Sequence, residues 1–212
     1  VLLVAYSVLL LTCNGYAYDE TSILSVVDRS VLGGNMMNDG GIDPEGILST
    51  IPSIAHVIIG YLVGAIALSD MPLKDKVLNM AQWGILMLFA GLLADSFLPI
   101  NKKVWSPTYV LTTCGLASSL LGVLVWVVDV KGKRQWSRFF EVFGINPLFM
   151  YVLGGVLSII LGSTGVHGWI YGDVLQPLLG DTAGSLAYAL LFVALCWCIG
   201  FPLYKRRIYI KI

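Results

Sequence analysis

The sequence predicts an all-α protein, a polytopic bundle of transmembrane helices with about five full spanning helices and one more that is truncated at the N-terminus. Of the 212 residues, 57% are hydrophobic and only 12% are charged, whereas ordinary soluble domains carry about a quarter charged residues. Mean hydropathy is +0.82. This composition excludes a disordered chain, a nucleic-acid-binding domain and an ordinary cytosolic enzyme.

Five apolar runs are long enough, or nearly long enough, to cross a bilayer as helices. They cover residues 48–68, 77–98, 109–128, 147–161 and 183–204, and a sixth run covers residues 1–13. Because Val1 already lies inside an apolar run that no basic stretch precedes, we expect a membrane helix there rather than a signal peptide. We therefore expect this chain to be the C-terminal part of a longer polytopic protein.

Proline and capping residues mark where several of these helices begin. Ser106-Pro107 and Asn146-Pro147 each place a capping side chain before a proline that suits the first helical turn. Pro52 lies near the start of the run 48–68, so that helix is expected to begin or to kink there.

Small residues recur at helical spacing in two of the runs. Gly60 and Gly64 form a Gly-x-x-x-Gly, and Gly155, Ser158 and Gly162 follow one another along the run that begins at residue 147. This pattern is typical of membrane helices that pack closely, so we expect both faces to lie against neighbouring helices.

The distribution of basic residues predicts the orientation in the membrane. Lys102 and Lys103 in loop 99–108 and Arg29 in loop 14–47 are outnumbered by the basic residues of the alternate loops and the tail, so the C-terminus is expected to be cytoplasmic. Loops 14–47, 99–108 and 163–182 then face outside. The ten basic residues on the expected cytoplasmic side are Lys74, Lys76, Lys131, Lys133, Arg134, Arg138, Lys205, Arg206, Arg207 and Lys211.

Two carboxylates, Asp43 and Glu45, stand one residue apart near the end of the outer loop 14–47. Such a pair could act as a general base with an orienting acid, or could bind the hydroxyls or the amine of a sugar. The alternative is structural: Asp43 would cap a helix, Pro44 would occupy its first turn, and Glu45 would complement the helix dipole. The sequence leaves both interpretations open.

Ionisable residues also occur within or beside the apolar runs. His56 lies about two turns inside the run 48–68, where an ionisable residue is a functional candidate, although a neutral histidine bonded to a neighbouring helix is an equal alternative. Asp95 lies near the outer end of its run and is interpreted as an interfacial acid, and His167 as a loop residue.

Two loops carry basic residues that are candidates for ligand binding. Asn101, Lys102, Lys103 and Trp105 form a cationic ledge beside an aromatic ring on the nominally negative side, which suits an anionic or sugar ligand. On the other side, Lys131 begins a basic stretch that could attract the phosphates of a nucleotide-like donor or could serve only as a topology signal with lipid contacts. The spacing of a phosphate-binding P-loop is absent from this stretch.

Several stretches together resemble the heparan-α-glucosaminide N-acetyltransferase family of membrane acetyltransferases and its compact bacterial members. They occur in the family's order and cover nearly the whole chain. The stretches are Val27-Asp28-Arg29-Ser30-Val31-Leu32-Gly33, Asp43-Pro44-Glu45-Gly46-Ile47-Leu48-Ser49-Thr50-Ile51, Pro99-Ile100-Asn101-Lys102-Lys103-Val104-Trp105-Ser106, Val127-Val128-Asp129-Val130-Lys131-Gly132, Gly144-Ile145-Asn146-Pro147-Leu148 and Lys205–Ile212.

The resemblance implies an enzyme that moves an acetyl group from cytoplasmic acetyl-CoA, its co-substrate, to a terminal glucosamine or similar amino sugar across the membrane. It implies a catalytic histidine in the N-terminal half of the family's membrane core, which this chain lacks. His56 does not match that histidine, because the corresponding family position is usually apolar. Residues 1–212 are thus expected to be the C-terminal part of a single transmembrane acyltransferase domain, inactive alone, with no catalytic residue of its own and no metal.

Roles for residues of this chain follow from the resemblance and from the chemistry of acyl transfer, which needs a neutral amine, a base and a donor for the carbonyl oxygen. Asp43, Glu45, Asn101 and Lys102 are expected to position the acceptor, with Lys102 or Asn101 as the donor. Asp28 and Arg29 are expected to orient the acceptor or to form a structural ion pair. Lys131 and Asn146 are expected to hold the CoA end.

No Asn-x-Ser/Thr acceptor for glycosylation occurs in the chain, which favours a bacterial inner-membrane protein. The expected partners are the lipid bilayer and an amino-sugar or glycan acceptor, without nucleic acid, and a homo-oligomer is left open. Two other classes remain: a transporter of a sugar or ion that uses His56 and Asp95 in the membrane, and a non-catalytic membrane scaffold.

Overall fold

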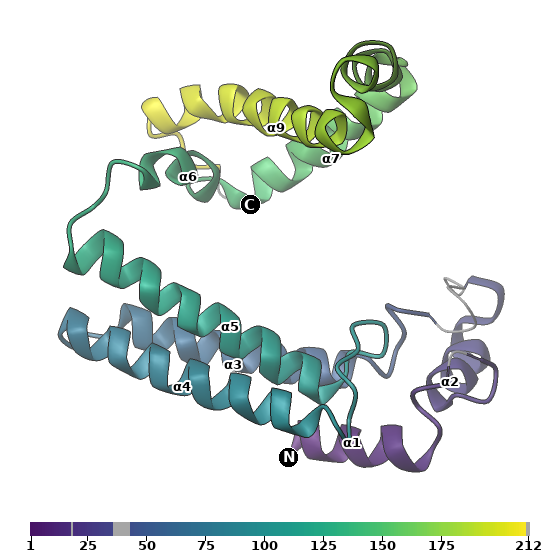
Figure 1. Cartoon of the computed structure of the whole chain (residues 1–212). Coiled ribbons are helices and arrows are strands. Elements are labelled where there is room, and N and C mark those ends of the chain that lie inside the picture. Colours follow the sequence, from purple (N-terminus) through teal and green to yellow (C-terminus); the bar gives the residue numbers. More distant parts are fainter. Residues whose placement is uncertain (18, 36–42, 211–212) are drawn as a thin grey trace. The chain divides into compact units, whose positions relative to one another are not determined.

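The computed structural model describes residues 1–17, 19–35 and 43–210, so that Lys211, Ile212 and part of the predicted loop 14–47 lie outside the described residues. Within the described residues, all regular structure is helical (Figure 1), which confirms the predicted all-α class. The chain divides into two compact units, residues 1–132 and 133–212, which are taken in turn.

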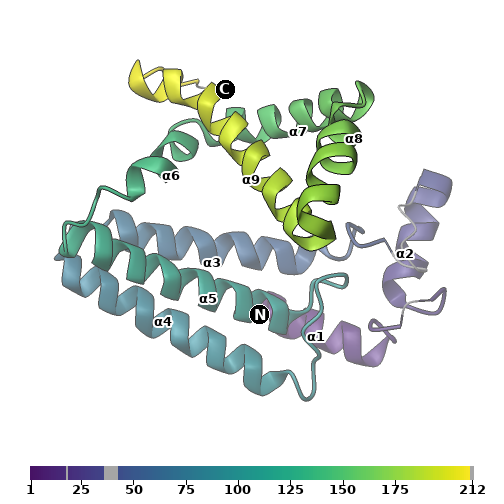
Figure 2. The same ribbon diagram turned by 45° about the horizontal axis from the view of Figure 1, so that its top comes forward.

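The first unit is built on three long helices that lie side by side in both views (Figures 1 and 2). A short apolar helix and a short amphipathic helix precede them. The elements are α1 (Leu2–Thr12), α2 (Ile23–Leu32), the 3₁₀ turn η1 (Gly33–Asn35), α3 (Thr50–Leu68), α4 (Leu73–Ala94), α5 (Pro107–Val125) and the π-helical turn η2 (Trp126–Val130) that extends α5.

Helices α4 and α5 make the closest helix–helix contact of this unit. A Cβ atom added to Gly115 would collide with the backbone of Leu88, and one added to Gly84 would collide with Ser119. The hydroxyl of Ser118 donates a 2.9 Å hydrogen bond to the carbonyl oxygen of Met80. Small residues therefore bring the two backbones together here, as they do at other membrane helix interfaces.

The close packing predicted at the other small residues is not observed within the described residues. A Cβ atom at Gly60, Gly64, Gly155 or Gly162 would meet nothing within 4 Å. Sequence spacing identifies a face that could accept a neighbour, but it does not show which face meets one.

The second unit consists of a short helix, two long helices and a π-helical segment. The elements are α6 (Ser137–Gly144), α7 (Pro147–Ser163), α8 (Val166–Gly168), the π-helical η3 (Trp169–Leu175) and α9 (Gln176–Lys205). Helices α6 and α7 are bent by 84° relative to each other. Gly180, with φ of 77° and ψ of 174°, interrupts α9, and the side chain of Gln176 donates a 2.7 Å hydrogen bond to Asp181 across the interruption.

By length and composition, four helical segments of the described residues can cross a membrane, or five if α6 and α7 count as one broken span. Helix α1 has 11 residues and is shorter than a span. The chain is therefore an integral membrane protein with the predicted architecture. The helix that was expected to start near residue 183 includes the segment before Gly180 as well.

Some local predictions hold and others need correction. Ser106 caps α5, because its Oγ accepts the backbone N–H of Tyr109 at 3.2 Å, and Pro52 lies in the first turn of α3. Asn146 occupies the capping position of α7, but its side chain makes no capping hydrogen bond. The predicted outer loops contain α2, α8 and η3, and His167 lies in a helix rather than in a loop.

We predict opposite effects for two glycine-to-alanine substitutions in spanning helices. Gly115→Ala should lower the free energy of unfolding by about 1–3 kcal/mol, because the new methyl group has no room between α4 and α5. Gly64→Ala should be neutral or stabilising, because the site is open and alanine favours helix by about 1 kcal/mol. Thermal unfolding in detergent measures both, and equal unfolding temperatures would contradict the packing described.

Candidate functional site

The carboxyl group of Asp28 ties α2 to the segment that precedes α3. Asp28 has an exposed fraction of 0%, and its Oδ1 accepts the backbone N–H of Ile47 at 2.8 Å. Its Oδ2 is also buried and accepts no hydrogen bond within the described residues. Burial raises the pKa of this carboxyl, the bond from Ile47 opposes the rise, and the negative charge of Asp43 adds to it.

The segment 43–47 fits tightly against that carboxyl. A Cβ atom at Gly46 would collide with the carboxyl of Asp28, so only glycine fits here without displacement. Asp43 is 6% exposed, and its Oδ1 accepts the backbone N–H of Glu45 at 2.9 Å. Asp43 therefore closes a turn and caps no helix, since α3 begins only at Thr50. Glu45 is exposed.

Arg29 points to a different partner from the one considered in the sequence. Its Nη1 lies 2.9 Å from Oε1 of Glu20, a side chain that is 80% exposed. The structural ion pair between Asp28 and Arg29 is therefore not formed. An exposed pair such as Arg29–Glu20 contributes little to stability, and its position marks the solvent side of α2.

The loop between α4 and α5 is held in a defined shape by its own polar groups. The side-chain oxygen of Asn101 accepts the backbone N–H of Lys103 at 2.8 Å, and its backbone N–H donates to Ser106 Oγ at 2.9 Å. Asp95 accepts the backbone N–H of Ile100 at 2.7 Å and so closes the other end of the loop. Lys102 is exposed.

A hydrogen bond between distant segments fixes this loop against α1. The Tyr6 hydroxyl donates to the carbonyl oxygen of Val104 at 2.8 Å, with both groups buried. Tyr6 and Val104 share a core with Leu10 and Leu24, so α1, α2 and the loop before α5 pack around one another. This core places the Asp28 carboxyl and the Asn101 loop in the same unit.

Two aromatic nitrogens near this loop are buried without a partner among the described residues. They are Nε1 of Trp105 and Nδ1 of His56. The two rings are 5.9 Å apart, and Trp105 adopts a left-handed φ of 50°. His56 also lines a cavity of about 260 Å³ between α3 and α5, together with Cys114 and Ser118.

Sequence reasoning missed two tyrosines of this region. Tyr6 anchors the loop. The hydroxyl of Tyr16 is buried near Ser106 and has no hydrogen-bond partner among the described residues. Burial raises the pKa of Tyr16 to about 12, with Ser106 opposing the rise and Asp95 adding to it. For Tyr6 the available signal was its place inside the first apolar run, since a buried Tyr hydroxyl usually finds a polar partner.

The two residues expected to hold the CoA end lie in different units and have local partners. Lys131 is exposed in the first unit, with its Nζ 4.7 Å from the centre of the Trp126 ring. In the second unit, the Asn146 amide donates to the carbonyl oxygen of Ile208 at 2.8 Å and accepts the backbone N–H of Ile210 at 2.8 Å. Their part in binding CoA stays a prediction.

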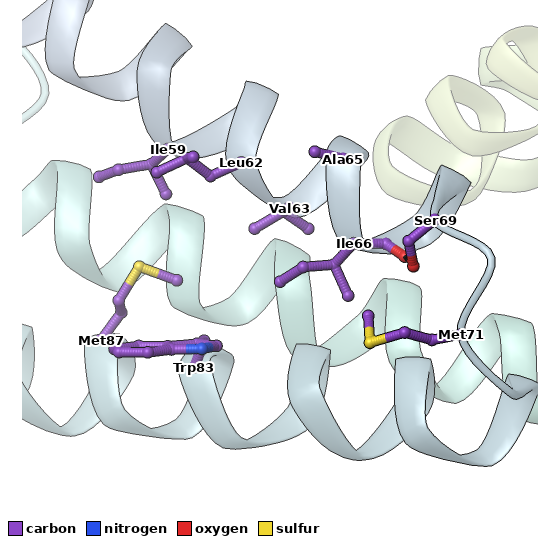
Figure 3. Close-up of a pocket in the computed structure, with 9 residues that line it drawn as sticks. All are labelled: Ile59, Leu62, Val63, Ala65, Ile66, Ser69, Met71, Trp83 and Met87. Atoms are coloured by element: carbon purple, nitrogen blue, oxygen red, sulfur yellow. Dashed lines mark hydrogen bonds between the residues drawn. The ribbon is translucent and has the colours of Figure 1, made fainter.

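A larger cavity, about 560 Å³, lies between α3 and α4 and is almost wholly apolar (Figure 3). Trp83 and Met87 form its α4 side, and Ser69 supplies its polar side chain. It has no titratable lining group. Acid–base chemistry is better supported by Asp28, Asp43, Glu45 and the loop that contains Asn101 and Lys102, which are together called the polar layer of this unit.

Two curated proteins match the chain. Over 117 residues, 52% of this chain, it is 39% identical to the heparan-α-glucosaminide N-acetyltransferase of Homo sapiens and covers 18% of that protein. Over 204 residues, 88% of this chain, it is 30% identical to the protein of the same name from Mus musculus and covers 30% of it. No family model matches the chain.

These matches confirm the resemblance to the heparan-α-glucosaminide N-acetyltransferase family. The chain spans less than a third of the length of either relative, which is consistent with a resemblance to the C-terminal half.

Substitutions of Asp28 should separate its hydrogen-bond role from its charge. Asp28→Ala should lower the free energy of unfolding by about 1–3 kcal/mol, because it leaves the part-buried N–H of Ile47 without its acceptor. Asp28→Asn keeps that acceptor and cannot ionise. We therefore expect Asp28→Asn to be at least as stable as the wild type at neutral pH.

The pH dependence of unfolding should separate the two Asp28 variants. Because the folded-state pKa of Asp28 is raised above its ordinary value near 3.8, its stabilising contribution is complete below about pH 4 and is lost as pH rises through the raised pKa. Unfolding temperatures measured from pH 4 to pH 8 should show Asp28→Asn gaining on the wild type as pH rises. A parallel loss for Asn and Ala at every pH would contradict this assignment.

Proposed function

We propose that the membrane protein containing this chain transfers an acetyl group from cytoplasmic acetyl-CoA to a glucosamine-like amino sugar on the outer face of a bacterial inner membrane. The observation that carries the proposal is a match, at 30% identity and over 88% of the chain, to a protein named heparan-α-glucosaminide N-acetyltransferase. Residues 1–212 would form part of a single transmembrane acyltransferase domain, with the C-terminus in the cytoplasm.

Acetyl transfer to an amine needs specific groups around the acceptor. The neutral amine nitrogen attacks the acetyl carbonyl carbon, the carbon–sulfur bond breaks, and CoA leaves as a thiolate that takes up the proton lost by the amine. The amine loses a proton to a base, and the carbonyl oxygen needs a donor while it is negative. The resemblance implies a histidine outside the present chain as the acetyl-accepting or base group, so the proposed role of the residues described here is to bind and orient.

We propose different parts for the acceptor residues, according to their exposure and their hydrogen bonds. Glu45 and Lys102 are exposed and suit direct contact, Glu45 with the hydroxyls or amine of the sugar and Lys102 with an oxygen. Asp43 and Asn101 shape the two segments that carry them, through bonds to the backbone of Glu45 and of Lys103. Asp28 and Arg29, both on α2, would orient the acceptor from the other side of these segments by holding the segment 43–47 and α2 in place.

The proposed CoA contacts lie at other places in the chain. Lys131 presents a cation beside Trp126, which suits a phosphate next to an aromatic surface. Asn146 would act mainly by holding the tail around Ile208, since both ends of its amide are engaged there.

The first test is acetyl transfer by the purified full-length protein in detergent. Radiolabelled acetyl-CoA is incubated with and without glucosamine, and the label is followed. We expect label on the sugar. No binding and no transfer in a folded sample, tested with several amino sugars, would contradict the proposal, and counterflow of labelled sugar without acetyl-CoA would favour a transporter that uses His56.

Variants of the same protein test the assigned residues. Asp43→Ala or Asn101→Ala should reduce turnover at least tenfold, because each shapes a segment that holds the acceptor. Glu45→Gln and Lys102→Gln, at exposed positions that leave these turns intact, should raise KM for the sugar without changing the unfolding temperature. Unchanged kinetics in all four would assign these residues to structure alone.

A further inference from the structure

Helix α6 does not continue in the direction of α7. The two helices meet at 84°, and α6 has 8 residues, a length of about 12 Å at 1.5 Å per residue. Such a bent pair is a broken span, a re-entrant loop or a helix that lies in the membrane surface. Its packing partners decide among these.

Helix α6 packs against the C-terminal end of α9 (Figure 1). The ring of Phe139 stacks on Trp197 with centroids 6.0 Å apart, and Trp197 Nε1 donates to the Phe139 carbonyl oxygen at 3.1 Å. The Tyr204 hydroxyl donates to Glu141 at 2.9 Å. Because α9 ends in Lys205 and then two arginines, and charges are expensive in hydrocarbon, this end lies at the membrane–water interface.

The side chains of α6, and of Trp136 just before it, suit a position at the membrane–water interface. Trp136, Phe139 and Phe140 are 44%, 41% and 58% exposed. Glu141 is the one acid in the sequence between residues 133 and 172. Exposed aromatic side chains beside basic ones on a short amphipathic helix are typical of a helix in the interface plane. The basic residues at this end of the unit are Lys133, Arg134, Arg138, Lys205, Arg206 and Arg207.

Two of these cations are brought together from distant parts of the sequence. Arg138 stands three residues before Glu141 and Arg207 three residues after Tyr204, and the 2.9 Å hydrogen bond from Tyr204 to Glu141 joins these two segments. The tail that follows Arg207 is held by Asn146, which bonds to the backbone of Ile208 and Ile210. Both guanidinium groups are exposed, and Arg fits a phosphate in a bidentate manner.

We propose that α6 is an interfacial helix that binds anionic phospholipid, with Phe139 and Phe140 entering the acyl boundary and Arg138 and Arg207 binding the lipid phosphate. Membrane-surface charge attracts such residues, and each cation near the surface adds to the preference for anionic lipid. This inference is independent of the proposed enzymatic function. A soluble phosphate compound such as CoA carries the same chemistry, but it would leave the exposed phenylalanines without a partner.

The test measures lipid selectivity of the full-length protein by native mass spectrometry. The protein in detergent is titrated with phosphatidylglycerol and with phosphatidylcholine, and the ratio of first binding constants is taken. Arg138→Gln with Arg207→Gln should reduce the preference for phosphatidylglycerol about tenfold. Arg138→Lys with Arg207→Lys should retain most of it, and this pair also shows that loss in the Gln variant is not loss of folding.

A matched control removes two positive charges elsewhere. Lys74→Gln with Lys76→Gln, on α4 outside this unit and not among the proposed acceptor or CoA contacts, should change the preference less than twofold. An equal loss in the control, or an unchanged ratio in the Arg138→Gln, Arg207→Gln variant, overturns the proposal. Displacement of bound phosphatidylglycerol by CoA at matched concentration would assign the arginines to the nucleotide instead.

Insertion is measured separately with a spin label at Phe140→Cys, with the exposed Cys13 and Cys198 replaced by serine. In vesicles of phosphatidylglycerol and phosphatidylcholine, the label should be more accessible to oxygen than to a water-soluble nickel reagent. Greater accessibility to nickel would place α6 in water and overturn the insertion.

Discussion

The polar layer of the first unit depends on one buried hydrogen bond, from the Tyr6 hydroxyl to the carbonyl oxygen of Val104. These residues are 98 positions apart, so the bond joins α1 to the loop before α5. Without it, two buried polar groups would lack partners, which costs about 1–3 kcal/mol for each. The apolar contacts of Tyr6 and Val104 with Leu10 and Leu24 then bring α2 to the same place.

The rest of the layer follows from that arrangement. Once α2 is in position, Asp28 reaches the backbone of Ile47, and Gly46 admits the carboxyl where any larger residue would collide. Once the loop is in position, Asn101 turns it and Trp105 lies beside His56. Glu45 and Lys102 are therefore exposed residues on two segments whose backbones are held by side-chain hydrogen bonds, an arrangement that suits preorganised binding.

The spanning helices could be predicted from the sequence because a bilayer demands long apolar runs whatever their neighbours are. The cap at Ser106 was equally local, since its acceptor role involves Tyr109 three residues on. Features that depend on distant partners could not be read in this way. Helix α2 is short and half polar, Asn146 binds a carbonyl 62 residues away, and the glycines that pack, Gly84 and Gly115, had no more conspicuous spacing than the open pair Gly60 and Gly64.

We propose that the polar layer anchored by Tyr6 carries the acceptor side of acetyl transfer. The most direct measurement is the steady-state kinetics of Tyr6→Phe in the full-length protein, with amino sugar and acetyl-CoA varied separately. KM for the sugar should rise about fivefold or more while KM for acetyl-CoA is unchanged, because only the anchor of the Asn101 loop is lost. Unchanged KM for the sugar, or a rise confined to acetyl-CoA, would contradict it.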